Sequence, residues 1–207
     1  MRAQEQKFFG SFFKKRTFFL SLNMTTRIIA GTWRGKTLSA PPGLATRPTS
    51  QRMRQAVFDM LMHAPWGGRA LLEGACVLDG FAGTGAMGLE ALSRGAARAT
   101  FIESDRAALA VLRANLAACG ALGRSLVLPA DVLRPPRGTA QALVFLDPPY
   151  GNDLLPAAET ALRQAGWISR GTVVVSESGH LDPARNYGDI LAERLHGAAR
   201  VIVWQEA

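Results

Sequence analysis

The sequence predicts an α/β protein in which helices cover both faces of a parallel sheet. Short apolar bursts, typical of buried strands, occur at 75–79, 98–102, 125–129, 142–146 and 171–176. Segments rich in Ala and Leu at helical spacing lie between them, at 86–94, 105–118 and 154–165. Strands that alternate with helices form a parallel sheet. The 207 residues, 48% of them hydrophobic, suffice for one large domain or one domain with an appendage.

Both ends of the chain depart from this alternation. Near the N-terminus, the pattern around 31–35 predicts two short strands joined by a turn. Pro48 bars a helix before it, and the stripe of Met53, Val57, Met60 and Leu61 predicts a helix after it. At the C-terminus, 187–195 and 200–205 predict a closing antiparallel hairpin.

The net charge of +8 is unevenly distributed along the chain. Residues 1–23 contribute +4, residues 24–69 contribute +6, and residues 70–207 contribute −2. We expect 24–69 to be a basic docking segment for an anionic partner, attached to a near-neutral domain at 70–207. Residues 1–23 pair phenylalanines with lysines and are interpreted as a dispensable extension, with translation starting at Met24. A surface amphipathic anchor is the alternative. No apolar run approaches the ~20 residues of a membrane span.

Cysteine and histidine usage indicates no disulfide framework and no metal site. The two cysteines, Cys76 and Cys119, lie among apolar neighbours, and we expect buried thiols in a reducing cytoplasm. The three histidines, His63, His180 and His196, share no ligand or catalytic spacing.

The strongest local motif is a glycine loop between a predicted strand and a predicted helix. Gly83, Gly85 and Gly88 form G-x-G-x-x-G, which allows a tight turn and close approach of a nucleotide ligand. Glu103 ends the next strand, 20 residues after Gly83, where an acid can bind ribose hydroxyls. Nicotinamide and flavin binders share this geometry, and a turn without ligand is a further alternative.

Asp79 distinguishes between these ligands. It ends the strand four residues before the first glycine. A carboxylate there would repel a pyrophosphate but attract the ammonium of S-adenosylmethionine (SAM). Asp131, after the third strand, is placed to accept an adenine amino group, or it is an ordinary loop aspartate.

A second motif, Asp-Pro-Pro-Tyr, follows the fourth strand at 147–150. The prolines fix an extended course and remove two donors, which leaves the Asp147 carboxylate and the Pro148 carbonyl as acceptors. Two acceptors match the two protons of an exocyclic amine, and Tyr150 can stack on the base that carries it. The alternative is a turn in which Asp147 only caps.

These motifs resemble those of a known family. DGFAGTG with DPPY is similar to class I SAM-dependent amino-methyltransferases. More narrowly, RIIAGTWRGKTL, TRPTSQRMRQAVFDML, DGFAGTGAMGLEALSRGA, FIESDRAAL, LDPPY and YGDI resemble the RsmD family, which methylates N2 of guanine 966 in 16S ribosomal RNA. The resemblance runs from about Arg27 to Trp204 and excludes residues 1–23. It implies a Rossmann-like class I methyltransferase fold with a seven-stranded, mostly parallel sheet.

The resemblance also implies roles for individual residues. The cofactor-binding set is Asp79, Phe81, Gly83, Gly85, Gly88, Glu103 and Asp131, with Glu103 on the ribose and Asp131 on the adenine. The catalytic set is Asp147, Pro148 and Tyr150. The basic segment offers six residues for phosphate contact, although each alone could be a solvated charge: Arg27, Arg34, Lys36, Arg47, Arg52 and Arg54.

The expected function is therefore methylation of 16S ribosomal RNA by a cytoplasmic, monomeric enzyme that uses SAM and no metal. Its partner would be the small ribosomal subunit or an assembly intermediate. An adenine-N6 methyltransferase acting on DNA or another RNA is the alternative with the same chemistry. A nicotinamide oxidoreductase and an RNA-binding module without activity are the alternatives from other classes.

Overall fold

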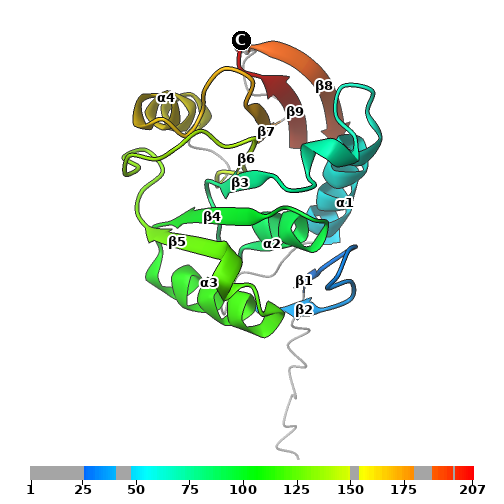
Figure 1. Cartoon of the computed structure of the whole chain (residues 1–207), viewed down its shortest axis with the longest axis vertical. Helices are drawn as coiled ribbons and strands as arrows, with labels where there is room; N and C mark the ends of the chain where they lie inside the picture. Colours follow the sequence, from blue (N-terminus) through cyan, green and yellow to red (C-terminus); the bar gives the residue numbers. More distant parts are fainter. Residues whose placement is uncertain (1–25, 41–47, 150–153, 180–187, 198) are drawn as a thin grey trace, which may run out of the picture.

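A computed structural model of the chain describes residues 26–40, 48–149, 154–179, 188–197 and 199–207. Within these ranges, one sheet has the strand order β5-β4-β3-β6-β7-β9-β8, and β1 and β2 form a separate small hairpin (Figure 1). Strands β3 to β7 are parallel, and β9 is antiparallel to both β7 and β8. The predicted α/β fold, with seven sheet strands and a closing antiparallel hairpin, is confirmed.

The elements follow the predicted order. The sheet strands are β3 (Cys76–Asp79), β4 (Arg98–Glu103), β5 (Ser125–Pro129), β6 (Leu143–Leu146), β7 (Val173–Gly179), β8 (Asp189–His196) and β9 (Ala199–Gln205). The helices are α1 (Pro48–His63), α2 (Ala86–Ser93), α3 (Arg106–Cys119) and α4 (Leu155–Ala165), with 3-10 turns at η1 (Arg69–Leu71) and η2 (Leu122–Arg124). The N-terminal hairpin pairs β1 (Thr26–Arg27) with β2 (Thr37–Leu38).

Helices cover the two faces of the sheet unequally. Helices α1, α2 and α3 pack on one face, where Phe58 of α1 stacks at a tilt on Phe145 of β6, with ring centroids 5.5 Å apart. Helix α4 packs on the other face, where Leu162 joins a core with Val144 and Val174. Successive residues of a strand point alternately into these two cores, so nearly every position is buried. The strands therefore appear in the sequence as continuous apolar runs.

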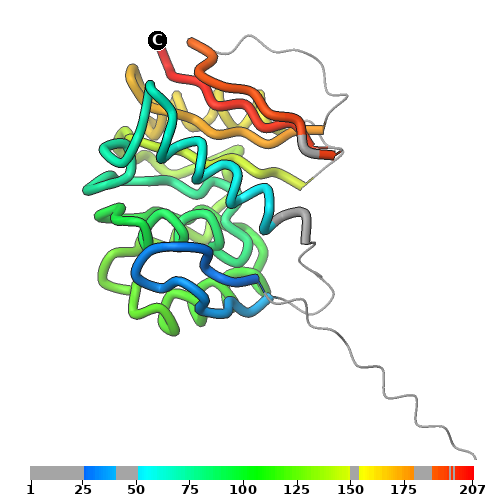
Figure 2. The backbone as a smooth tube through the Cα atoms, turned by 90° about the vertical axis from the view of Figure 1, so that its right-hand side faces the viewer, coloured from blue at the N-terminus to red at the C-terminus, as the bar shows by residue number. Residues whose placement is uncertain are grey.

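The basic N-terminal segment shares the core of the sheet. Ile28 and Leu38 of the hairpin region, with Met53 and Leu61 of α1, belong to the same buried cluster as the first face of the sheet. In Figure 2 the hairpin and α1 lie across one side of the molecule. The change in charge near residue 69 therefore does not coincide with a boundary between two cores.

Two further expectations can be compared with the described residues. Cys119 is buried as predicted, but Cys76 is exposed, because it begins β3 at the amino-terminal edge of the sheet. The prediction of a buried thiol was therefore wrong for Cys76. No helix in the described part of the chain is long and apolar enough to cross a membrane.

Candidate functional site

Five parallel strands carry an acidic residue at or near their carboxyl ends. These residues are Asp79 on β3, Glu103 on β4, Asp131 after β5, Asp147 after β6 and Glu177 on β7. The chain starts the sheet at β3, adds β4 and β5 on one side, and then adds β6 and β7 on the other. Ligands of such sheets bind at the carboxyl ends of the strands, where the order of addition reverses. The acids therefore mark the edge where a ligand is expected.

The glycine loop joins β3 to α2 at this edge, and its glycines serve different purposes. A Cβ on Gly88 would lie 2.3 Å from a ring carbon of Phe101, so Gly88 lets α2 pack closely on β4. Gly85 has φ +79°, and a Cβ there would lie 2.4 Å from a side-chain carbon of Leu112. Gly85 therefore also serves close packing. Gly83 has φ +52°, and a Cβ there would meet nothing closer than 3.9 Å. Only Gly83 of these three therefore keeps open space for a ligand.

The backbone amides of this loop are hydrogen-bonded to carboxylates. Gly83 N–H donates to Glu103 Oε2 at 2.7 Å, and Gly88 N–H donates to Asp79 Oδ2 at 3.0 Å. In a dinucleotide-binding turn such amides face the pyrophosphate. Here two carboxylates occupy that position, which disfavours an anionic ligand and argues against the nicotinamide alternative.

Asp79 is almost fully buried, with 4% of its surface exposed. Burial raises the pKa of Asp79 to about 7; the Gly88 amide opposes this rise, the Glu103 charge adds to it, and the Arg54 charge opposes it. A bound cation would remove the cost of ionising this group. The geometry thus suits a positively charged ligand.

Glu103 and Asp131 flank the loop on the β5 side. Besides the Gly83 amide, Glu103 accepts the Asp105 amide at 2.7 Å, so the protein fixes both of its carboxylate oxygens. Asp131 accepts the Leu133 amide at 2.9 Å and lies 3.6 Å from the exposed Arg134 guanidinium. Both acids are partly exposed at the edge, where a ligand can reach them.

Asp147 lies directly after β6, next to β3 in the sheet. Asp147 is exposed at the edge. Desolvation of the carboxylate, the largest cause, together with the charges of Glu177 and Asp79 raises the pKa of Asp147 to about 8. Pro148 is buried, and Tyr150 lies outside the described residues. Phe81, in the glycine loop, is partly buried against the α4 side of the sheet.

Glu177 was missed by the sequence analysis. It lies in β7 and is partly exposed. The signal was present in a weaker form, because Glu177 comes two residues after the apolar run 173–175, whereas Asp79, Glu103 and Asp147 directly follow theirs. It is the fifth acid of the edge.

The predicted RNA-binding cations differ in exposure. Arg27, Arg34, Lys36 and Arg52 are exposed. Lys36 Nζ donates to the Ala118 carbonyl near the end of α3, which ties the hairpin to that helix. Arg47 lies outside the described residues.

Arg54 is buried, with 5% of its surface exposed. Its guanidinium donates to the Arg27 carbonyl at 2.7 Å and lies 3.9 Å from Glu90. Burial lowers the pKa of Arg54, and the Glu90 charge opposes this effect. A phosphate cannot reach this group. The burial of Arg54 therefore contradicts its predicted role in RNA binding.

Glu90 of α2 was also missed. It is fully buried and accepts the amides of Ile29 at 2.8 Å and Ala30 at 3.0 Å, as well as Arg94 Nε at 2.8 Å. Ser93, on the same helix, accepts the Trp33 amide at 3.0 Å. The helix that carries the glycine loop therefore also holds the N-terminal hairpin.

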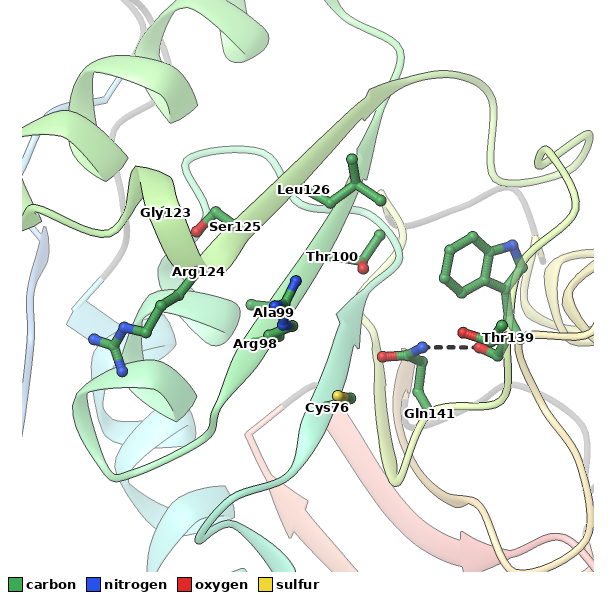
Figure 3. A pocket seen from close by; sticks show the side chains of 11 residues that line it. Cys76, Arg98, Ala99, Thr100, Gly123, Arg124, Ser125, Leu126, Thr139 and Gln141 are labelled. Atoms are coloured by element: carbon green, nitrogen blue, oxygen red, sulfur yellow. Dashed lines mark hydrogen bonds between the residues drawn. The ribbon is translucent and has the colours of Figure 1, made fainter.

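The cavity in Figure 3 lies away from this edge. Its volume is about 350 Å³, and its lining includes Cys76 and Arg98, the first residues of β3 and β4. The amino-terminal ends of the strands thus contribute to it, whereas the acids gather at the carboxyl ends. The cavity is not the site described above.

The described arrangement defines a class I methyltransferase fold, in which a SAM site lies at the carboxyl edge of the sheet. The open space at Gly83 and the acids of the edge fit SAM, which carries an ammonium and a sulfonium. In this site Asp79 and the glycine loop would hold the methionine part, Glu103 the ribose and Asp131 the adenine.

Comparison with known proteins gives the family. Residues 26–205 match the family model described as "Conserved hypothetical protein 95". The "Ribosomal RNA small subunit methyltransferase D" of Escherichia coli K12 is 41% identical over 154 residues, which covers 73% of this chain and 74% of that protein. The protein of the same name from Haemophilus influenzae is 34% identical, covering 73% and 78%. The chain belongs to this family, which is the RsmD family that its motifs resemble.

Solved structures agree with this assignment. The yhhF protein of Escherichia coli has a TM-score of 0.74 and 35% sequence identity, covering 88% of this chain and 98% of that one. A Haemophilus influenzae protein has a TM-score of 0.70 and 29% identity, covering 87% and 98%. The predicted class I methyltransferase fold is therefore confirmed.

Proposed function

We propose that this protein transfers a methyl group from SAM to the exocyclic N2 of a guanine in 16S ribosomal RNA, at position 966 by family resemblance. Membership of a family whose relatives are named ribosomal RNA small subunit methyltransferases supports the RNA substrate. One observation carries the choice of an exocyclic amine: the Asp147 carboxylate and the Pro148 backbone follow β6, beside the cofactor strand β3. The amine's two N–H groups match these acceptors.

Bound SAM supplies an electrophilic methyl group on a sulfonium. The residues of this chain then have to orient the amine and exclude water, because the reaction needs alignment more than a strong base. Asp147 and the Pro148 carbonyl accept the two N2 protons, which favours a more tetrahedral amine and stabilises its developing positive charge. Ionised Asp147 accepts most strongly, and a cationic ligand nearby favours that form.

A guanine that is paired or stacked cannot reach this edge. The base is therefore flipped out or unpaired, and Tyr150 replaces the lost stacking. The exposed cations Arg27, Arg34, Lys36 and Arg52 bind phosphates and make the affinity depend on salt. Arg47, predicted from the sequence for the same role, lies outside the described residues. The RNA is presented within the small subunit or an assembly intermediate, to a monomeric enzyme that needs no metal.

The second candidate is methylation of adenine N6, which has the same chemistry at a different base edge. The test is to incubate the protein with labelled SAM and small ribosomal subunits from cells that lack it, and then to digest the RNA to nucleosides. We expect the label in N2-methylguanosine. Label in N6-methyladenosine, with none in N2-methylguanosine, would refute the proposal.

A further inference from the structure

Glu177 shares one face of the sheet with the two aspartates of the site. The pairing of β6 with β7 places Leu146 opposite Ser176, so the next residues, Asp147 and Glu177, are level on neighbouring strands. Parallel neighbours lie about 4.8 Å apart. Phe145 and Val175, two residues earlier, both point into the core beneath α1 and α2, so Asp147 and Glu177 are expected on that same side.

Asp79 lies on the same face of β3, two residues below the level of Asp147. It pairs with Phe145 and follows Val77, which lies in the same core. Three carboxylates therefore follow one another across β3, β6 and β7 on one face of the site. The electrostatics agree with this placement, because Glu177 and Asp79 are the two charges that raise the pKa of Asp147.

We propose that Glu177 selects guanine by accepting the N1–H of the base while Asp147 and Pro148 hold its N2 amine. This inference rests on the proposed function and names the residue that decides between guanine and adenine. Guanine presents N1–H and N2–H₂ as adjacent donors. Adenine presents its amine beside N1, which is an acceptor.

A row of acceptors matches guanine and mismatches adenine. Asp147 and the Pro148 carbonyl provide two acceptors, and a carboxylate one strand away provides a third beside them. With adenine, the Glu177 carboxylate would face the N1 lone pair and lose a hydrogen bond in a partly desolvated site. Sites built to bond a donor discriminate strongly against analogues that lack it. A carboxylate has about four acceptor positions, so Glu177 can bind the base and still be held by the protein.

The test uses 2-aminopurine, which has the 2-amino group of guanine but an acceptor at N1. Ribosomal RNA with either base at the methylated position is assembled into small subunits and given to the full-length protein, Glu177→Gln or the control Glu73→Gln. Glu73 is an exposed acid before β3, at the opposite edge of the sheet. Both RNAs are compared within each protein at one pH, so a change in the ionisation of Asp147 between the proteins cancels in the ratio.

We expect the wild type and Glu73→Gln to prefer guanine strongly. In Glu177→Gln, the ratio of kcat/KM for guanine to that for 2-aminopurine should fall by about 10- to 100-fold, because the amide can donate to N1. Fluorescence of 2-aminopurine reports the flipped base independently of turnover, and should rise more with Glu177→Gln than with the wild type. If Glu177→Gln turns over neither base, competition between the two RNAs for the folded variant gives the ratio of their affinities, which should shift in the same direction.

An unchanged ratio in Glu177→Gln, by turnover or by competition, would overturn the role of Glu177. Failure of the proposed function looks different, because the wild type itself would then place no methyl group on guanine N2.

Discussion

Replacement of the buried Glu90 by Gln should destabilise the protein by about 3–5 kcal/mol, the range for removing one partner of a buried ion pair. The change keeps the volume but removes the charge opposite Arg94, at 2.8 Å, and near Arg54, at 3.9 Å. The new amide group also turns a donor toward one of the amide donors of Ile29 and Ala30. Water cannot compensate, because Glu90 is fully buried and the two arginines expose only 8% and 5% of their side chains.

The free energy of unfolding is measured by urea titration followed through tryptophan fluorescence. The matched control is Glu193→Gln, because Glu193 accepts from Arg200 Nε at the same distance of 2.8 Å but is 42% exposed. Exposed ion pairs contribute about 0–1 kcal/mol, so this control should change little. A loss for Glu90→Gln no larger than that of the control would refute the view that Glu90 fastens the hairpin to α2.

Four further changes separate structural from functional roles. Gly88→Ala should lower the free energy of unfolding by about 1–3 kcal/mol, because its Cβ would lie 2.3 Å from Phe101. Gly83→Ala should cost about 1–2 kcal/mol for its positive φ and also weaken SAM binding, as measured by calorimetry. The raised pKa of Asp147 means that its contribution to stability is complete below about pH 4 and is lost as pH rises through about 8. Asp147→Asn should therefore raise the melting temperature at pH 9 but not at pH 4. The same variant should lose methyl transfer and keep its affinity for SAM. Transfer by this variant at the wild-type rate would contradict the role of Asp147. Arg52→Glu should weaken RNA binding and reduce its salt dependence, and unchanged RNA affinity would remove Arg52 from the docking surface.

The fold was predictable because each element has its own period in the sequence. Strands buried on both faces are short apolar runs, and the helices between them are longer and rich in Ala and Leu, so their order alone defines a parallel sheet. The number of sheet strands came from family resemblance. The strand order β5-β4-β3-β6-β7-β9-β8 was not predicted, because no local pattern specifies which strands become neighbours. The open face over β4 and β5, where Leu126 is 51% exposed, was not predicted. An α/β alternation implies a covering helix, and here an irregular segment replaces it between β5 and β6.

The site was predictable where its chemistry follows the end of a strand. Asp79, Glu103 and Asp147 each directly follow an apolar run, and Glu177 comes two residues after its run. Arg54 was assigned wrongly because counting charges ignores which way a helical residue faces. With Val57, Phe58 and Leu61 it forms the i, i+3, i+4, i+7 stripe of α1, so it had to be buried. Its partner Glu90, 36 residues away, could not be found from spacing.

The separation of charge explains how an enzyme with an acidic site can act on a polyanion. Five acids line the carboxyl edge of the sheet, and any phosphate that entered would be repelled. The exposed cations lie instead on the hairpin segment, which carries Arg27, Arg34 and Lys36, and on α1, which carries Arg52. A nucleobase offers N–H donors without the charge of its phosphate, so a flipped base can enter where the backbone cannot. The hydrogen bonds of Glu90 and Ser93 hold the basic hairpin on α2, so the proposed RNA-docking surface is fixed to the helix that follows the proposed cofactor loop.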